Sequence, residues 1–417
     1  MSDRYGEPVP PIETAVPRQA RSIRNDERIL EAAVRLADQE GWHGLLIARV
    51  AEAAGLSRRT VSDRVPDRQA LATWVWSQRL APVVIQALSR LIEAMTPDSP
   101  AGSPSLDPQR LGHAIDAFTE PDEQMRAAAE LLIVATFDPP LHLAVHDTVG
   151  TALAQWLTPT PGQVSAADAA RRGYVISTAL GCLLEARRQE GVRVDLTAEW
   201  EQLCATLTAR DADRALQQQV PEVHFDHWDG AFDFATGDPA QDRLLEATRD
   251  EIGHKGYDAA TIDSIVAASG RTKGLLFGRY PSKKQLFNDV TDRYTKGMYD
   301  LNERAWERML QTMTPAIAEA VLLREFMRPG REHLWVFALE QYRLSWHDPD
   351  MREAVAASMA EAIANRMESD PTRTPEQWQA TLFVAAAQGI GTMLLGSCYD
   401  QAWTLPYQVM TVPLHDD

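Results

Sequence analysis

Apolar residues recur at helical spacing along most of the chain. Ile29, Ala33 and Leu36, for example, share one face of a helix because they are three or four positions apart. Such amphipathic segments follow one another without a convincing run of the alternating residues that a strand requires. The sequence therefore predicts an all-α protein. Long helices are expected in the first half over residues 68–95, 108–119, 122–136, 140–157, 164–190 and 197–219, and in the second half over residues 283–313, 315–328, 331–346, 348–369 and 375–401.

The pattern of residues 28–71 occurs a second time, without a gap, in residues 243–286. Most paired positions keep their apolar or polar character across this separation of 215 residues. The repeat indicates that one folding unit is present twice in the chain. The identical pairs are Arg28/Arg243, Leu30/Leu245, Glu31/Glu246, Ala32/Ala247, Gly41/Gly256, Ile47/Ile262, Ala53/Ala268, Gly55/Gly270, Arg64/Arg279, Pro66/Pro281 and Leu71/Leu286.

Each copy predicts three short helices. In the first copy Gly41 ends the first helix, where a residue with positive φ is favoured, and Gly55 ends the second. Ser57 stands where its hydroxyl can cap the third helix, and Pro66 closes that helix before a long fourth one. Three short helices with a glycine turn before the third are the layout of a helix-turn-helix DNA-binding domain. The second copy repeats these positions with Gly256, Gly270, Thr272 and Pro281.

Charge is distributed unevenly along the chain. The 417 residues carry a net charge of −18, which taken alone argues against a polyanionic partner. Residues 18–79, however, hold 11 basic against 8 acidic residues, and residues 238–296 hold 10 against 9, so the remainder carries −22. Residues 271–284 contain five cations and no acid. A cationic patch on an acidic body is typical of a DNA-binding head joined to a larger domain that does not bind DNA.

The sequence gives little support to catalytic or metal chemistry. No P-loop, dinucleotide-binding glycine pattern or Gly-x-Ser-x-Gly motif occurs. His142 and His146 stand four apart on a predicted helix but lack a third ligand, and His224 and His227 are equally weak candidates. We therefore expect no metal, no cofactor and no enzymatic activity. An enzyme on a helical scaffold without a local motif stays open as an alternative.

Compartment is indicated by the termini and the cysteines. The first residues are polar and proline-rich, without the apolar stretch of a signal peptide, and no apolar run is expected to reach the length of a membrane span. Cys182, Cys204 and Cys398 lie far apart within helical apolar patterns, so we expect buried reduced thiols. These features predict a cytoplasmic protein without membrane contact.

Both copies resemble the N-terminal domain of the tetracycline-repressor (TetR) family of bacterial transcription regulators. The second copy follows the family pattern with Gly256 and Tyr257, Thr261, Ser269 and Gly270, Thr272, Lys273 and Gly274, Phe277, Tyr280, Lys283 and Leu286. The first copy keeps Gly41, Trp42, Ala54, Gly55, Ser57 and Leu71 but departs at Leu46, Ser62, Asp63, Val65 and Arg68. An aspartate in the third helix opposes phosphate contact, so the first head is expected to bind DNA more weakly or to read different bases.

The resemblance implies that the third helix of each copy reads DNA. Arg58 and Arg59 begin this helix in the first copy, where guanidinium groups can contact guanine bidentately. For any single residue the competing interpretation is a solvated helix face. Arg18, Arg21 and Arg24 precede the first head and either reach the minor groove or only solubilise the chain. The residues expected to contact DNA are Arg58, Arg59, Thr60, Ser62, Arg64, Arg68, Thr261, Arg271, Thr272, Lys273, Gly274, Phe277, Arg279, Tyr280 and Lys283.

Domain organisation follows from the repeat and the resemblance. We expect a flexible arm (1–23), head one (24–80), body one (81–220), a linker (221–237), head two (238–296) and body two (297–417). The linker carries Phe225, Trp228, Phe232 and Phe234, which suggests that it packs on a body. In the family, the last two helices of each body form a four-helix dimer interface. Gly181 and Gly391 stand at equivalent places in small-residue segments, which indicates an intramolecular pseudo-dimer with heads roughly 34 Å apart.

The predicted function is a sequence-specific DNA-binding regulator, a repressor rather than an activator, with an imperfect palindromic operator. The resemblance implies that a small ligand in the helical bodies controls it. Residues that could line a pocket, or simply be core, are Trp156, Trp335, Trp346, His113, His146 and His333. Two alternatives stay open: a ligand-sensing or protein-interaction protein whose heads no longer bind DNA, and a homodimer that carries four heads.

Overall fold

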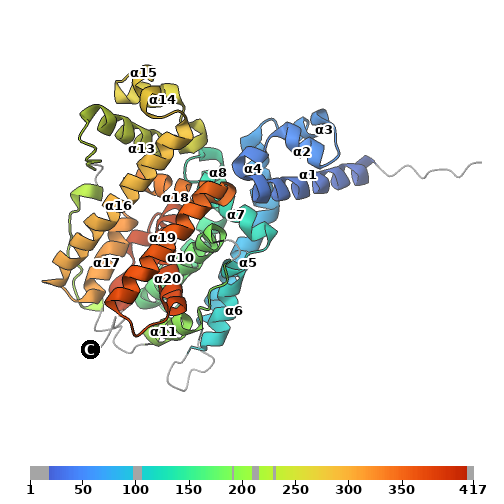
Figure 1. Cartoon of the computed structure of the whole chain (residues 1–417). Helices are drawn as coiled ribbons and strands as arrows, with labels where there is room; N and C mark the ends of the chain where they lie inside the picture. Colours follow the sequence, from blue (N-terminus) through green and yellow to red (C-terminus); the bar gives the residue numbers. More distant parts are fainter. Residues whose placement is uncertain (1–17, 97–105, 190–191, 209–215, 229–231, 411–417) are drawn as a thin grey trace, which may run out of the picture.

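The computed structural model describes residues 18–96, 106–189, 192–208, 216–228 and 232–410. Within these residues the fold is all-α, as predicted, and the one β-type pairing is an isolated bridge between Thr160 and Val164. Figure 1 shows two small heads on the upper side of a helical body, one at each flank. Many helices begin at a Pro preceded by a capping Asp or Thr, because Pro suits the first helical turn and the side-chain oxygen accepts a free amide.

Head one has the predicted three helices. Gly41 and Gly55 adopt positive φ (+66° and +63°), which explains why glycine ends the first two helices. Ser57 caps the third helix, since its Oγ accepts from Thr60 N at 3.1 Å. The elements are α1 (Arg18–Glu40), η1 (Gly41–Gly44), α2 (Ile47–Ala53) and α3 (Arg58–Ser62).

One boundary differs from the prediction. The expected flexible arm extends to residue 23, but α1 begins at Arg18, so residues 18–23 are helical and continue head one. No proline or glycine follows Pro17 until Gly41, so nothing in the sequence interrupts the helix. Arg21 and Arg24 are therefore on α1 rather than on an arm, and the rest of the expected arm lies outside the described residues.

Head two repeats this arrangement. Gly256 and Gly270 again adopt positive φ (+74° and +63°). Thr261 caps the second helix in a reciprocal capping box with Ser264, and Thr272 caps the third by accepting from Leu275 N at 3.2 Å. The elements are α13 (Pro239–Ala259, kinked at Gly256), α14 (Ile262–Ser269) and α15 (Lys273–Arg279).

Body one begins with a helix that is continuous from the head. A π-helical segment, η2 (Trp76–Leu80), joins α4 (Arg68–Val75) to α5 (Ala81–Ala94), and a second one, η3 (His146–Gly150), joins α8 (Pro139–Val145) to α9 (Thr151–Leu157). The predicted ends hold to within two residues except in the last helix, which was expected to reach residue 219 and ends at Leu207; residues 209–215 of that prediction lie outside the described residues. The remaining helices are α6 (Pro108–Thr119), α7 (Glu123–Val134), α10 (Ala166–Arg188) and α11 (Thr197–Leu207).

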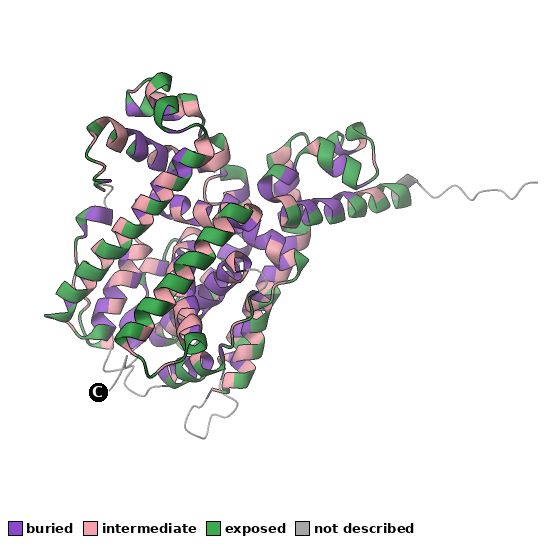
Figure 2. Ribbon diagram, viewed as in Figure 1, coloured by how far each residue is buried: buried purple, intermediate pink, exposed green. Residues whose placement is uncertain are grey.

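Body two follows the same order without π-helical segments in its described helices. Its fourth helix, α19, has no buried residue, and Figure 2 shows it largely green across the front of the molecule. The elements are α16 (Lys283–Leu310), α17 (Pro315–Phe326), α18 (Glu332–His347), α19 (Pro349–Ser369), α20 (Pro375–Cys398), η5 (Ala402–Thr404) and η6 (Tyr407–Val409).

The two bodies pair through α10 and α20, which form the most extensive contact between any two helices of the described chain. A Cβ added at Gly181 would lie 1.7 Å from Ala387 O, and one added at Gly391 would lie 1.8 Å from Ser177 O. Gly391 stands 210 positions after Gly181, and Ala387 stands 210 positions after Ser177. The two close contacts are therefore related by a pseudo-two-fold axis. The intramolecular pseudo-dimer is thus observed.

The expected four-helix interface is only partly present. Across the seam α10 packs against α20, α18 and η6, α7 packs against α18, and α11 and η3 touch α20, whereas α19 packs on α18 and α20 of its own unit. One apolar core includes Leu180 and Leu184 of body one together with Ile390 and Leu394 of body two. The bodies therefore share a core instead of each closing its own.

The linker packs on body two as predicted. The rings of Phe225 and Trp228 lie 4.5 Å apart between centroids, and Trp228 stacks on Phe326 of α17 at 4.6 Å. Trp228 belongs to the short helix η4 (Asp226–Trp228), and its Nε1 also donates to Asn302 Oδ1 of α16 at 2.9 Å. Phe232 meets Tyr294 edge to face at 4.9 Å. The segment is therefore anchored at both of its described ends.

Two further expectations concern the core helices. Contrary to the sequence analysis, α20 is long and apolar enough to cross a membrane by length and composition; its glycines and glutamines obscure a continuous apolar run. It instead pairs with α10 along the seam, the place of a core helix. Cys182, Cys204 and Cys398 are free and buried, as expected, and burial raises the pKa of the Cys204 thiol to about 11.

Candidate nucleic-acid interface

The third helix of head one presents two arginines to solvent. Arg58 and Arg59 occupy its first turn and are exposed, as is Ser62 one turn later. No hydrogen bond or ion pair joins either guanidinium to another described residue. Thr60 is partly buried, and its hydroxyl lies 2.8 Å from Ser57 Oγ. The start of α3 is therefore the cationic surface that head one offers.

Two other predicted contacts of head one are engaged within the protein. Arg64 forms an ion pair with Asp26 of α1 and donates to Ser22 Oγ at 3.1 Å. The guanidinium of Arg68 lies 4.8 Å from the centroid of the Trp42 ring. Arg64 thus ties the third helix to the first, and Arg68 ties the fourth helix to the turn after the first.

Head two presents a different set of side chains. Thr261, Thr272, Lys273 and Gly274 are exposed, and 51% of Phe277 is accessible to solvent. Lys273 Nζ lies 2.5 Å from Asp263 Oδ1, but both side chains are mostly exposed, so water and salt weaken this pair. Arg271 is partly buried at the turn.

The remaining predicted contacts of head two hold the head together. Lys283 Nζ donates to Tyr257 O at 2.7 Å and Ala260 O at 3.0 Å. Tyr280 is buried and donates to Asp289 Oδ2 at 2.5 Å; burial, with this carboxylate, raises its pKa to about 12. Arg279 pairs with Asp238.

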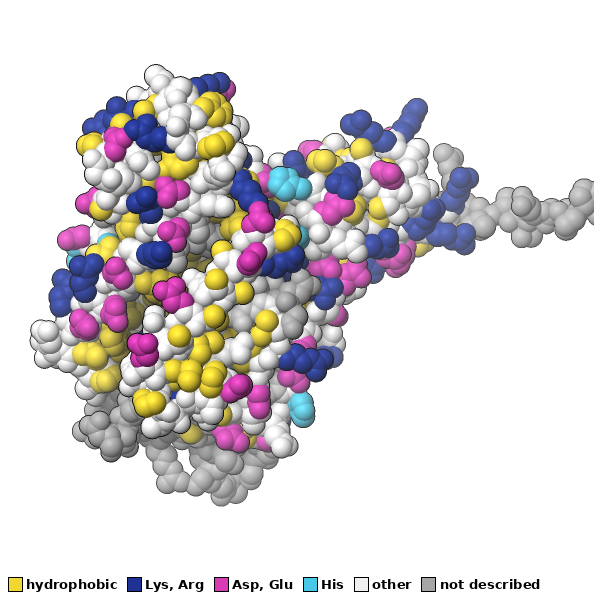
Figure 3. Space-filling model, in the orientation of Figure 1, with side chains coloured by type: hydrophobic (Ala, Val, Ile, Leu, Met, Phe, Trp, Pro, Cys, Tyr) yellow, Lys and Arg dark blue, Asp and Glu magenta, His cyan; other side chains and the backbone are white. Residues whose placement is uncertain are grey.

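These contacts change how the five-cation stretch is interpreted. Lys284 pairs with Asp348 at 2.6 Å, so in addition to Arg279 and Lys283 a third cation of the stretch is held by the protein. The run of basic residues in the sequence therefore overstates the free charge of head two. Basic side chains nevertheless gather on the outer surfaces of both heads in the space-filling view (Figure 3).

A glutamate in each body holds the turn that follows the first helix of each head. Glu130 of α7 accepts from Trp42 N at 2.7 Å, and Glu340 of α18 accepts from Tyr257 N at 2.6 Å. Both carboxylates are fully buried. This pair of glutamates was not predicted, although their spacing of 210 residues and their position within apolar helical faces are visible in the sequence.

Arg343 connects the two glutamates across the pseudo-two-fold axis. Its buried guanidinium lies 3.0 Å from Glu130 Oε1, pairs with Glu340 and lies 3.3 Å from Asp258 Oδ2 of head two. Burial alone would raise the pKa of Glu130, but Arg343 and His347 outweigh it and lower the pKa to about 2. The carboxylate is therefore charged and paired in the folded protein.

Each head also touches the body of the opposite unit. A Cβ at Gly41 would lie 2.8 Å from His347 Nε2 of body two, and one at Gly256 would lie 2.5 Å from the Phe137 ring of body one. Phe137 and His347 are equivalent residues, since each precedes an Asp-Pro helix start 210 positions apart. A shift of one body against the other therefore bears directly on both heads.

The histidines considered as metal ligands in the sequence are not gathered into a larger cluster within the described part of the chain. No group of three His, Cys, Asp or Glu side chains there could hold an ion. His142 and His146 stack with ring centroids 6.4 Å apart, and His224 lies 3.2 Å from Asp226.

Two helix-turn-helix heads with exposed basic third helices, carried on a paired helical body, define a DNA-binding transcription regulator. Residues 29–73 and 244–290 both match the family described as bacterial regulatory proteins, tetR family. The chain therefore carries the DNA-binding unit of this tetracycline-repressor family twice. No curated protein matches the chain.

Proposed function

We propose that the protein is a ligand-controlled repressor whose two heads bind one imperfect inverted repeat. The observation that carries this proposal is the covalent pseudo-dimer with one exposed third helix at each flank, on the same side of the molecule (Figure 1). Adjacent half-sites on one face of DNA require two heads held in this way. We also propose the domain division used above, with the first head beginning at Arg18.

The two heads should prefer different half-sites. Head one offers the paired guanidinium groups of Arg58 and Arg59, which suit guanine, whereas head two offers Lys273 and the apolar ring of Phe277. Asp63, exposed at the end of α3, repels phosphate in head one. The preferred operator is therefore an inverted repeat with unequal halves.

Control by a ligand is supported by the way the heads are attached. Glu130 and Glu340 each fix a head to the body of its own unit. His347 and Phe137 each contact the head of the opposite unit. Any ligand that changes how the bodies pair would change the separation of the heads and their fit to successive major grooves. We also propose that the protein acts in the cytoplasm, where it binds DNA.

The test is a fluorescence anisotropy titration of the DNA upstream of the protein's own gene, at several salt concentrations. Replacing Arg58 and Arg59 with Ala should weaken binding by about 1–3 kcal/mol per lost base contact, and so should replacing Arg271 and Lys273. Lys296→Ala, at an exposed lysine of α16, is the matched control and should leave affinity unchanged.

One alternative has its own support: Asp63 favours a first head that no longer binds DNA. In that case the Arg58/Arg59 variant would bind like the wild type while the Arg271/Lys273 variant loses affinity. A shallow salt dependence for the wild type would reject DNA binding by both heads. Light scattering distinguishes one chain of 46.3 kDa from a homodimer with four heads.

A further inference from the structure

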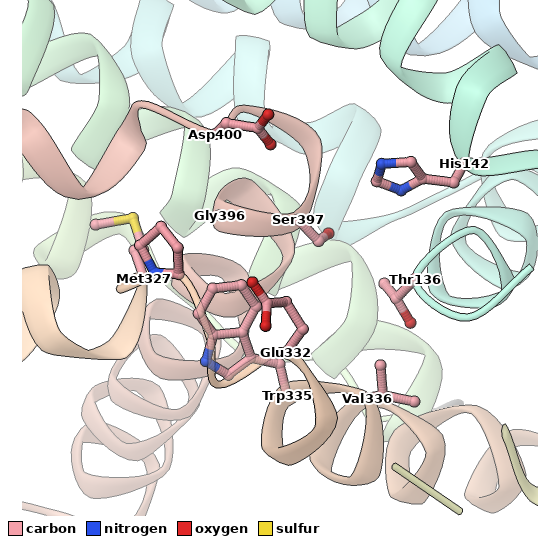
Figure 4. A pocket seen from close by; sticks show the side chains of 10 residues that line it. Thr136, His142, Met327, Glu332, Trp335, Val336, Gly396, Ser397 and Asp400 are labelled. Atoms are coloured by element: carbon pink, nitrogen blue, oxygen red, sulfur yellow. The ribbon is translucent and has the colours of Figure 1, made fainter. Parts of the chain in front are cut away.

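A cavity of about 400 Å³ lies at the seam between the units, beneath head two. Thr136 and His142 of body one form one wall, and the start of α18 with the end of α20 forms the other. Figure 4 shows the side chains of Glu332, Ser397 and His142 around a common space, with Asp400 at its edge. This volume suits a small organic molecule.

The pseudo-two-fold axis relates this cavity to a second place in the seam, which the chain fills by itself. The equivalents of Ser397 and Thr136, 210 positions away, are Arg187 and Trp346. The guanidinium of Arg187 lies 4.4 Å from the centroid of the Trp346 ring and donates to Asp38 O at 3.0 Å. One half of the seam therefore holds a planar cation on an aromatic ring, supplied by an arginine.

On the side of the seam that holds the cavity, small side chains leave open the space that Arg187 and Trp346 fill on the other side. Ser397 and Thr136 are too short to fill it, and the aromatic ring is now supplied from the opposite wall by Trp335, beside the apolar Met327 and Val336. The two seam sites thus share an aromatic ring and acidic neighbours, and they differ in whether the chain itself provides a cation.

The charges around the cavity favour a cation. Glu332 and Asp400 both line it, whereas the neighbouring Arg328 and Arg331 direct their guanidinium groups to the buried Glu325, at 3.1 Å each. A cation above an indole face, with carboxylates at its edge, is stabilised both by the ring quadrupole and by charge. We propose that this cavity binds a small planar organic cation in the position that Arg187 occupies in the other half.

The walls of the cavity touch head two directly, so this inference rests on the proposed function for its consequence. His333, one residue after Glu332, has its carbonyl oxygen 2.2 Å from where a Cβ of Gly253 in α13 would lie. Phe137, one residue after Thr136, packs its aromatic ring on Gly256 of the same helix. A ligand that parts the two walls would therefore move α13 and, with it, α15.

The test uses benzamidine, which combines an aromatic ring with a planar amidinium, and benzamide, its neutral counterpart of the same shape. Calorimetric titration of the full chain should give a Kd on the order of 1 mM for benzamidine and at least about tenfold weaker binding for benzamide. Ser397→Arg should abolish benzamidine binding by filling the cavity from within. Ser358→Arg, on the exposed helix α19, is the matched control and should bind like the wild type.

A second variant keeps the test decisive if Ser397→Arg does not fold, as judged by circular dichroism. Glu332→Gln combined with Asp400→Asn should reduce benzamidine binding about tenfold and leave benzamide unaffected. Equal binding of the two compounds, or benzamidine binding retained in folded Ser397→Arg, would overturn the inference. Operator binding without benzamidine binding rejects this site alone, and the reverse result rejects the proposed function alone.

Discussion

Replacing Gly391 with Ala should separate the helices that hold the two units together. The new Cβ would lie 1.8 Å from Ser177 O and 2.6 Å from Gly181 N, and real Cβ atoms essentially never lie within 3.0 Å of such atoms. Because both neighbours are backbone, no side chain can turn aside, and α10 and α20 must move apart by about 1 Å. A gap of that size forfeits roughly a quarter to a half of the dispersion energy across the seam. We expect the variant to lose about 3 kcal/mol of unfolding free energy, at the upper end for overpacking.

The chain supplies a matched control two residues away. Gly389 is on the same helix, but a Cβ there would meet nothing within 4 Å. Gly389→Ala should therefore stabilise the protein by roughly 0.5–1 kcal/mol, because alanine favours the helix. Urea unfolding followed by circular dichroism measures both variants, and their changes in free energy should have opposite signs. If Gly391→Ala is as stable as Gly389→Ala, the close approach of the two helices is not what pairs the units.

The remaining predictions concern three other parts of the molecule. Glu130 has a pKa of about 2 in the folded protein against an ordinary value of 4.5, so its contribution to stability is present above pH 4.5 and is lost as the pH falls toward 2. The wild type should be more stable than Glu130→Gln by on the order of 3 kcal/mol at neutral pH, and acid unfolding should show this difference shrinking between pH 4.5 and 2. Lys283→Met leaves two backbone carbonyls without their donor and should cost about 1–3 kcal/mol in urea unfolding. Lys284→Met breaks ion pairs in which the lysine itself is largely exposed, and it should cost less, about 1 kcal/mol or below. Burial raises the pKa of Cys182, so iodoacetamide should alkylate this thiol at least about tenfold more slowly in the native protein than in urea, as peptide mass spectrometry would show.

The secondary structure could be predicted closely because its signals are local. Asp-Pro and Thr-Pro pairs mark helix starts, and the glycines that end the head helices adopt the left-handed conformation that their positions require. The end of α11 was placed too late, because the apolar pattern continues beyond Leu207. The beginning of α1 was placed too late as well, because a basic, polar composition in residues 18–23 suggested an arm where helix formers are present.

The candidate interface could be predicted only in part, because pairing of charges depends on tertiary structure. Arg58 and Arg59 follow a capping serine, so their exposure on the first turn of α3 could be inferred from local pattern. Lys283 looks equally available in the sequence, yet its partners are carbonyl groups 23 and 26 residues earlier. The hydrogen bond from Trp42 to Glu130 spans 88 residues and required the fold itself.

Because α10 and α20 belong to one polypeptide, the pairing of the two halves is independent of how many molecules a cell contains. A family member that assembles from separate subunits dissociates on dilution, and each subunit then contacts only one half-site. Here the covalent linker keeps the second unit at a high effective concentration. Occupancy of an operator should consequently rise in simple proportion to the amount of protein, down to very low abundance. The duplication also lets the two halves diverge within one gene. Differences between them in sequence, in their side of the seam and in the preferred half-site are therefore inherited together.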